Sequence, residues 1–460
     1  MRYLLAVLIC IFGVSYAQDP LHAQENDAPA SDDSPFWNRA WISIQGNFIR
    51  QQHPAFPAQY SGPNSFLPDR DHATSRIETL YTGFRITSRL EILADVESAG
   101  GAGLSSALGI GGFTNVDVVR NPTLGEDPYI SRVMLHSIIP LSKETTEATR
   151  NPLSLASTVA VRRLELRLGK MSTVDFFDLN SVGSDSHLQF MNWAIVNNGA
   201  YDYAADTRGY TYGLVAEYYD RSWALRFGEM LMPSVANGID LDWNITRARG
   251  ENFEGEYHAS LLPRRAGVIR ALGFLNHANM GSYREAIDAY LAGKGSVPDI
   301  TLNRKQGRVK YGFGLNGEQE LTSLWRGFAR LGWNDGRNES FAYTEVDRTA
   351  EIGSDFRGAP WHRPQDKVGA AFVANGLSGD HREYLALGGL GFILGDGALH
   401  YGVEKIFETY YTAHVWRGIS FAIDYQHVRN PGYNQDRGPA SVVGFRIHVE
   451  DAVPTDRRPN

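Results

Sequence analysis

Residues 163–169 read Arg-Leu-Glu-Leu-Arg-Leu-Gly, so a charged and an apolar side chain alternate at every position. Successive side chains of a β-strand point to opposite faces. As a strand, this stretch carries Arg163, Glu165 and Arg167 on one face and three leucines on the other. A helix would mix both kinds around its circumference. The stretch therefore predicts a strand that lies between an apolar neighbour and water.

The same period of two recurs along the chain. Ile42, Ile44 and Phe48 share a face within Trp41–Phe48, and from Leu80 to Glu97 an apolar face opposes Tyr81, Arg85, Arg89, Glu91, Asp95 and Glu97. Further strands are expected at Tyr210–Tyr218, Trp223–Phe227, Val309–Glu318, Ala329–Asn334, Val368–Asn375, Phe407–Val415, Ile419–His427 and Val442–Glu450. Turn clusters such as residues 334–338 (NDGRN) separate them, which indicates an antiparallel meander. Ser282–Ala292 is expected to be a short helix in a loop.

The placement of charge favours a transmembrane barrel over a soluble β-sandwich or propeller. Arg446, His448 and Glu450 share one face of the last predicted strand, and Asp424 and Gln426 share one face of the strand before it. A charge on the lipid-facing side at mid-membrane would cost roughly 2–4 kcal/mol, so such faces are expected to line a watery lumen. A soluble sandwich remains the alternative, because bulk water would also accommodate these faces.

The N-terminus predicts export. Met1 and Arg2 precede an apolar run that ends in Ser15-Tyr16-Ala17, with the small residues that signal peptidase requires, so cleavage is expected after Ala17. Cys10, the only cysteine, lies in this leader. Residues 18–35 are acidic and are expected to be flexible, the barrel is expected over 36–450, and 451–460 is expected to be a polar tail.

Composition and motifs exclude several classes of function. Loss of Arg2 leaves 43 basic against 52 acidic residues, a net charge of −9 that disfavours nucleic acid as a partner. Mean hydropathy of −0.31 excludes a helical membrane protein. No serine-hydrolase elbow, zinc-protease motif or P-loop is present, and no cofactor or metal site is predicted. Asp240 and Asp242 share a predicted strand face, as in a glycosidase, but a polar lumen or loop explains this pair better. His258 and His277 show no ligand spacing.

Ordered short segments resemble the carbohydrate-selective porins of the OprB type over nearly all of the mature chain. The similar segments are 64–65 (NS), 79–83 (TLYTG), 101–105 (GAGLS), 109–113 (GIGGF) with Asn115, 162–164 (RRL), 168–170 (LGK), 173–178 (TVDFFD), 190–193 (FMNW), 201–209 (YDYAADTRG), 430–434 (NPGYN) and 436–439 (DRGP). Each is short, but their order along the chain makes the resemblance specific.

The resemblance implies one outer-membrane barrel of about sixteen strands, loops that fold inward, and passive uptake of monosaccharides or small oligosaccharides. Two departures stand out. The family usually ends on an aromatic strand terminus, whereas here residues 451–460 (DAVPTDRRPN) follow Glu450, so an internal signal around Phe445–Val449 is expected to serve the barrel-assembly machinery. The family's pattern is also altered at Thr114–Asp117, which leaves loop selectivity open.

Sugar binding in a pore requires forked donors, carboxylate acceptors and aromatic faces, since a pyranose offers hydroxyls around a ring. The expected pore-lining candidates are Arg85, Arg89, Glu91, Arg163, Glu165, Arg167, Asp424 and Arg446. The plainer alternative is that these groups only cross-link the lumen wall. The segments 109–115 and 190–209 are candidates for inward-folded loops.

Two other functions stay open at this point. They are a general or ion-selective porin of the same fold and a surface carbohydrate-binding β-protein without a pore. The expected partners are small sugars, outer-membrane lipids and the barrel-assembly machinery, and the pattern leaves monomer and homo-oligomer open.

Overall fold

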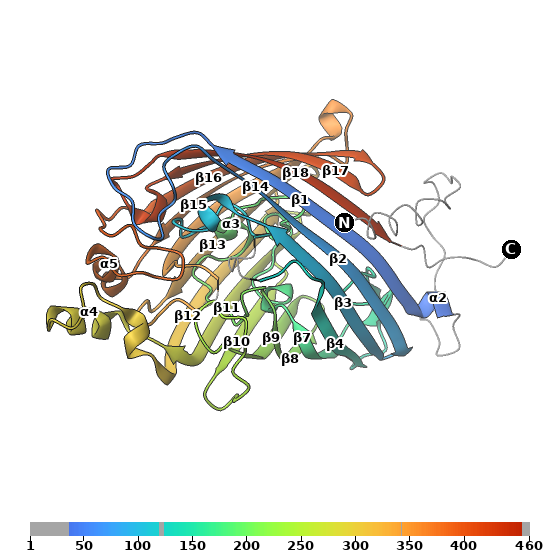
Figure 1. The fold of residues 1–460 in the computed structure, drawn as a ribbon. Coiled ribbons are helices and arrows are strands. Elements are labelled where there is room, and N and C mark those ends of the chain that lie inside the picture. The colour runs from blue at the N-terminus through green and yellow to red at the C-terminus, as the bar shows by residue number, and fades with distance from the viewer. Residues whose placement is uncertain (1–35, 119–123, 342, 453–460) are drawn as a thin grey trace.

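The computed structural model describes residues 36–118, 124–341 and 343–452 (Figure 1). Sixteen antiparallel strands pair edge to edge into one closed barrel, which confirms the predicted fold class. The first and last strands close it, with Ser43 opposite Ala452 and Gln52 opposite Val443. Closure leaves no unpaired edge in the wall.

The elements run in the following order. The barrel strands are β1 (Ala40–His53), β2 (Asp71–Thr87), β3 (Leu90–Gly101), β4 (Tyr129–Pro140), β7 (Arg163–Met171), β8 (Thr211–Tyr219), β9 (Trp223–Leu231), β10 (Arg249–Tyr257), β11 (Gly267–Met280), β12 (Lys305–Glu320), β13 (Trp325–Asn334), β14 (Arg348–Arg357), β15 (Lys367–Gly376), β16 (Glu404–Trp416), β17 (Ile419–Arg429) and β18 (Ala440–Ala452). A separate hairpin consists of β5 (Thr145–Glu147) and β6 (Thr158–Ala160), and the helices are α2 (Phe36–Arg39), α3 (Trp193–Val196), α4 (Tyr283–Leu291) and α5 (Gly379–Ala386).

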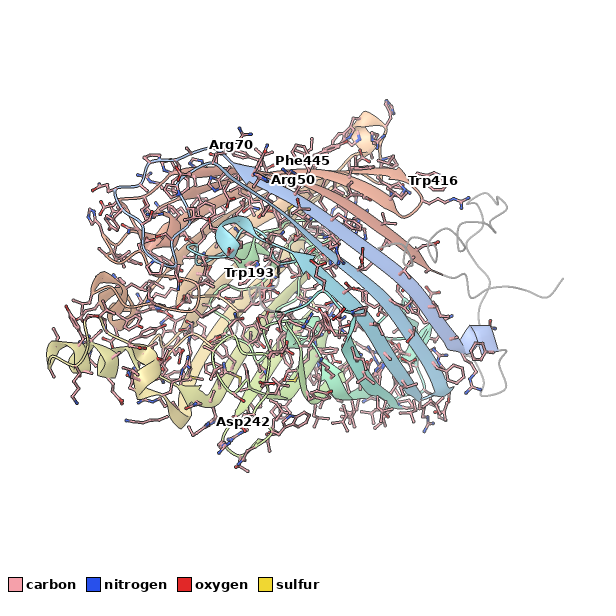
Figure 2. The ribbon with its side chains drawn as sticks, viewed as in Figure 1. Arg50, Arg70, Trp193, Asp242, Trp416 and Phe445 are labelled. Atoms are coloured by element: carbon pink, nitrogen blue, oxygen red, sulfur yellow. The ribbon has the colours of Figure 1, made fainter. Side chains whose placement is uncertain are left out.

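The wall is apolar outside and polar inside, as the alternation predicts. On β7, Leu168 is 59% exposed on the outer face, whereas its neighbour Arg167 is 5% exposed on the inner face. Phe445 and Ile447 of β18 point outward in the same way, and Arg446 between them is buried (Figure 2). The outward apolar residues face lipid, and the inward charges meet other polar groups.

Most predicted strands are confirmed, with shifted ends. The run from Leu80 to Glu97 is two strands, because Ser88 and Arg89 form a tight turn between β2 and β3. The predicted loop helix is confirmed as α4. Four barrel strands, β4, β10, β11 and β14, were not predicted, and neither were the short strands β5 and β6.

The two ends of the barrel differ in the length of their connections. At the end where β1 begins and β18 ends, on the right of Figure 1, the turns include residues 88–89, 220–222, 321–324 and 417–418. At the opposite end, where α4 and α5 lie, the connections include residues 102–128, 172–210 and 377–403. One connection at the end where β1 begins is long: residues 141–162, which carry β5 and β6.

A hydrophobic core lies inside the barrel. Phe113 and the helix α3, both on long connections, pack against inward side chains of the wall that include Phe328, Val373 and Ile406. The backbone N–H of Trp193 donates to the carbonyl of Phe113 at 2.8 Å, so the two connections also bind each other. The loops therefore fill the β13–β17 side of the lumen.

The expected leader (1–17) and acidic segment (18–35) lie outside the described residues. Strand β18 continues to Ala452, so the barrel extends two residues beyond the predicted boundary at Glu450. Residues 453–460 of the expected tail are not described. Within the described ranges, no helix combines the length and the apolar character needed to cross a membrane.

Candidate functional site: the barrel lumen

A cavity of about 450 Å³ lies between the inner face of β1–β4 and the two inward-folded connections. Its lining is polar and aromatic and includes Tyr81, Glu97, Tyr129, Arg132, Tyr210 and Tyr343. Its volume falls within the range of about 300–1,000 Å³ typical of small-molecule sites. Two hollows of about 610 Å³ are larger, but they are lined mainly by apolar residues and include outward ones such as Ile352 and Phe372.

Glu97 of β3 organises one wall of the cavity. Its carboxylate accepts hydrogen bonds from the hydroxyls of Tyr129 at 2.5 Å, Tyr210 at 2.8 Å and Thr79 at 3.1 Å. Each phenol lies across a different strand or loop, so one acidic group fixes two aromatic rings. Bonds to a charged acceptor are the stronger kind, which makes this wall rigid.

Arg132 of β4 forms the adjacent wall. Its guanidinium makes two parallel bonds of 2.7 Å to the carboxylate of Asp175 and lies 3.4 Å from Asp95. The same group lies 5.3 Å from the centre of the Tyr210 ring. The bidentate geometry holds the guanidinium in a fixed plane, which suits recognition of neighbouring hydroxyls.

Aromatic rings from the inward-folded connections complete the lining. Trp193 lies inside the barrel (Figure 2), stacks on Tyr343 at 4.4 Å, and donates its indole N–H to the carbonyl of Asn115 at 2.6 Å. Arg208 lies 3.9 Å above the Tyr129 ring. The adjacent Asp206 accepts from the backbone N–H of Arg208 at 2.9 Å, and burial raises the pKa of its carboxyl. The segments 109–115 and 190–209 thus lie inside the barrel, as expected.

Five of the eight predicted candidates belong to a different structure, a charged belt on the inner wall. The belt is a chain of alternating basic and acidic side chains that passes from β2 to β12 through Arg85, Glu91, His136, Glu165, Arg167, Glu217, Arg226, Glu256, Arg270 and Glu318. Neighbouring members are 2.8 to 3.4 Å apart, with a closer contact between Arg167 and Glu217. Arg163 joins it through Glu165 at 2.5 Å.

The remaining three candidates lie elsewhere. Asp424 is fully buried and accepts from Gln426 at 3.0 Å. Arg446 is 1% exposed and donates to the carbonyls of Ser186 and Gln189 at 2.8 and 2.9 Å. The expectation of a place on the inner wall is wrong for Arg89, which lies exposed in the β2–β3 turn. None of the eight side chains lines the 450 Å³ cavity, since Arg89 lies in an exposed turn and the other seven are held by their neighbours.

Three buried residues that bind the inward-folded connections, Glu404, Glu408 and Arg330, were not identified from the sequence. Glu404 accepts from the backbone N–H groups of Gly111, Gly112 and Gly432 at 2.9 to 3.1 Å. Four positions along β16, Glu408 accepts from Met191 at 2.5 Å and Asn192 at 3.1 Å. Both glutamates follow the same alternation as the polar face of the strand predicted there. This alternation was the feature of the sequence that could have identified them.

Arg330 of β13 plays the same part from the cationic side. It pairs with Asp178 at 3.0 Å and with Glu351 at 3.4 Å, and it donates to the carbonyl of Ile195 at 2.7 Å. The partners lie on the 172–210 connection and on the wall. Arg330 therefore ties that connection to the wall.

The residues that suggested hydrolysis or metal binding lie apart from the cavity. Asp240 and Asp242 lie in the 232–248 loop and not on a strand, and Asp242 pairs with Arg247 at 3.0 Å. His258 is more than half exposed beside Glu256, and His277 lies on β11. Within the described ranges no three His, Cys, Asp or Glu side chains are grouped as a metal site would require.

Comparison with known proteins agrees with this architecture. The sequence profile of the OprB family, described as carbohydrate-selective porin, matches residues 78–450. The high-pH structure of Pseudomonas putida OprB is similar over 90% of this chain and 94% of that chain, with 14% identity and a TM-score of 0.67. The crystal structure of Pseudomonas aeruginosa OccK2 (OpdF) is similar over 91% of this chain and 99% of that chain, with 10% identity and a TM-score of 0.45. No protein of curated description matches by sequence.

The profile spans most of the chain, and the structural likeness independently supports the barrel. Porins are passive channels, so the family match also sets aside a catalytic function. The chain belongs to the OprB family of carbohydrate-selective porins and is an outer-membrane protein.

Proposed function

We propose that monosaccharides and small oligosaccharides diffuse through the 450 Å³ cavity and contact Tyr81, Glu97, Tyr129 and Arg132. The observation that carries this proposal is the combination of phenol rings, carboxylates and the fixed guanidinium of Arg132 around a cavity of ligand size. Sugar rings present hydroxyls at the edge and weakly apolar C–H faces, so they match both kinds of lining.

The charged belt has a supporting role in this proposal. Its side chains pair mainly with each other and none of them lines the cavity, so they do not present free donors to a passing sugar. They shape the wall and hold opposite charges across neighbouring strands. We therefore assign sugar contact to the cavity lining and wall geometry to the belt.

The outward apolar face is the proposed surface for outer-membrane lipids. The closing pair β1–β18 is the proposed substrate of the barrel-assembly machinery, with outward-facing Phe445 and Ile447 as the proposed recognition signal. Short turns in outer-membrane barrels face the periplasm, so the end where β1 begins and β18 ends is assigned to that side.

The test is sugar-dependent conductance in planar bilayers, together with liposome swelling for a panel of neutral sugars and ions of similar size. The Glu97→Gln variant weakens the bonds to both phenols and is expected to reduce sugar block. Glu78→Gln, on the outward face of β2, is the matched control. If neutral sugars neither enter liposomes nor block current while ions pass freely, the protein is a general or ion-selective porin and the proposal fails.

A further inference from the structure

The long connection at the periplasmic end is an ordered hairpin. Beyond the β5–β6 pairing, its backbone bonds join Leu141 to Arg162, Val161 to Glu144 and Ala148 to Ser157, each at 2.8 to 2.9 Å. The tip is the tight turn Asn151–Ser154, in which the Asn151 side chain accepts from the backbone N–H groups of residues 153 and 154. We name residues 141–162 the inner hairpin.

The tip of the inner hairpin lies inside the barrel. Leu155 is 1% exposed and belongs to a cluster of inward side chains that includes Leu93, Met134 and Met171. Its backbone N–H donates to Glu91 at 2.9 Å, and its carbonyl accepts from Arg85. The first two members of the charged belt therefore hold the tip of this hairpin in the lumen.

The inner hairpin closes the periplasmic side of the cavity. Tyr81 of β2 and Glu97 of β3 line the cavity, but the inward residues closer to the periplasm, Gly83 and Leu93, do not. A Cβ atom on Gly83 would lie 3.1 Å from Leu155, so the leucine occupies the space of a side chain there. Leu153, two residues before it, lines the cavity itself.

Further contacts with the wall keep the inner hairpin in place. The guanidinium of Arg150 donates to the carbonyl of Ala40 at 2.8 Å and lies 5.8 Å from the Trp41 ring. Ala156 and Val159 pack against Ile138 of β4. Another turn at the same end, residues 258–266, behaves differently, since its Leu261 is 74% exposed.

We propose that the inner hairpin is the exit-side selectivity element of the channel, with Leu153 and Leu155 setting the largest sugar that leaves the cavity toward the periplasm. This inference rests on the proposed passage of sugars through the cavity. An apolar pair at the exit offers no hydrogen bond to a hydroxyl, so it selects by size, whereas the polar lining above it selects by chemistry.

The experiment compares three variants with the wild type. In the first, residues 148–157 are replaced by Asn-Gly, a two-residue turn suited to joining the paired strands β5 and β6. In the second, Leu153→Gly and Leu155→Gly remove only the two side chains. The control is Leu261→Gly in the exposed turn. Heat-modifiable gel mobility confirms that each barrel is folded.

Single-channel conductance is expected to rise roughly twofold or more in the first variant, and liposome swelling is expected to extend to larger sugars in both hairpin variants. The control is expected to match the wild type. Folded hairpin variants with wild-type conductance and an unchanged size limit would overturn the inference. If wild-type protein passes ions but no sugar, the proposed function fails instead, and the conductance comparison still tests the exit.

Discussion

The two halves of the inner wall use the same residue types in different ways. From β2 to β12, arginine and glutamate side chains pair with one another across neighbouring strands. From β13 to β18, Glu404, Glu408 and Arg446 instead bond the backbone of connections that fold into the lumen. The first half mainly cross-links itself, although Arg85 and Glu91 also hold the inner hairpin, and the second half mainly binds the connections at the opposite end.

The difference shows how a barrel of this size is made narrow. A wall whose charges pair with each other leaves space beside it, and the cavity lies along β1–β4. A wall whose charges bond loop backbone becomes covered by those loops, since buried N–H groups require acceptors. The loop-binding residues therefore decide where the opening lies, although they do not line it.

The largest effect is expected from Glu404→Ala in the loop-binding half. Three buried N–H groups lose their acceptor, each at about 1–3 kcal/mol, so we expect a total loss of roughly 4 kcal/mol. The 102–118 connection should loosen and conductance should rise. Denaturant unfolding and single-channel recording measure the two effects. Glu404→Gln, which keeps an acceptor oxygen, should lie between this variant and the wild type, and an unchanged conductance in Glu404→Ala would contradict the division of the wall.

Arg167→Ala tests the self-paired half. It leaves Glu165 and Glu217 with one arginine partner fewer in a buried site, and we expect about 3 kcal/mol of destabilisation. Because Arg167 contacts neither the cavity nor the loop N–H groups, conductance should stay at the wild-type value. Denaturant unfolding measures the loss of stability, and parallel single-channel recording measures the conductance. A conductance change as large as that of Glu404→Ala would erase the distinction between the halves.

His381 lies outside the membrane-spanning strands. Its site combines pairing between charged side chains with binding of loop backbone. It pairs with Asp347 at 3.0 Å and Glu345 at 3.7 Å, while Glu345 also accepts from the backbone N–H groups of Ile393 and Leu394. Burial opposes the imidazolium charge, but the two carboxylates outweigh burial and raise the pKa of His381 to about 9. The Tyr283 ring stacks on it at 4.2 Å.

A raised pKa gives a contribution to stability that is complete below the unfolded value near 6.5 and is lost as pH rises through about 9. Between pH 7 and 10 we expect a loss of about 2 kcal/mol from this residue. Unfolding free energies across that range, compared with those of His381→Gln, measure it. Equal slopes for the two proteins would show that the ion pair contributes nothing.

The smallest effect is expected from Asp242→Asn. Asp242 pairs with Arg247, which is half exposed, and neither residue lines the cavity. Pairs of this kind contribute little, and we expect a change below about 0.5 kcal/mol with wild-type conductance and sugar uptake. Denaturant unfolding measures the change in stability, single-channel recording measures the conductance, and liposome swelling measures the sugar uptake. A marked loss of uptake would place this loop on the sugar path and would reopen the significance of the carboxylate pair.

How far prediction reached depended on how strictly residues alternate. Residues 163–169 alternate without exception, and β7 was predicted at that place. Strand β4 has apolar residues on both faces, since its inner side packs Met134 and Ile138 into the lumen core, so the alternation is lost. In β10 the outward positions are Arg249, Glu251, Phe253 and Gly255, and such a mixed face gives no signal.

The candidate residues show the same limit. Parity placed Arg85, Glu91, Glu165 and Arg167 on the inner face, where the structure has them. The alternation along a strand does not reveal whether an inward charged side chain contacts water, another side chain or a loop. The neighbours that enclose these four residues come from distant segments, including Leu155 of the inner hairpin and Phe176 beside Arg167.

The sequence by itself determined the strand periodicity, the inward direction of the charges and the family, because these depend on local order along the chain. Only the tertiary structure decided which inward residues face open space. Strand closure brings β1 beside β18, and the connections then fill one side of the lumen, so exposure depends on contacts between residues hundreds of positions apart. Glu97 lines the cavity and Glu408 does not, although both are glutamates on inward faces, since Glu97 accepts from side-chain hydroxyls at the cavity wall and Glu408 accepts from buried loop backbone.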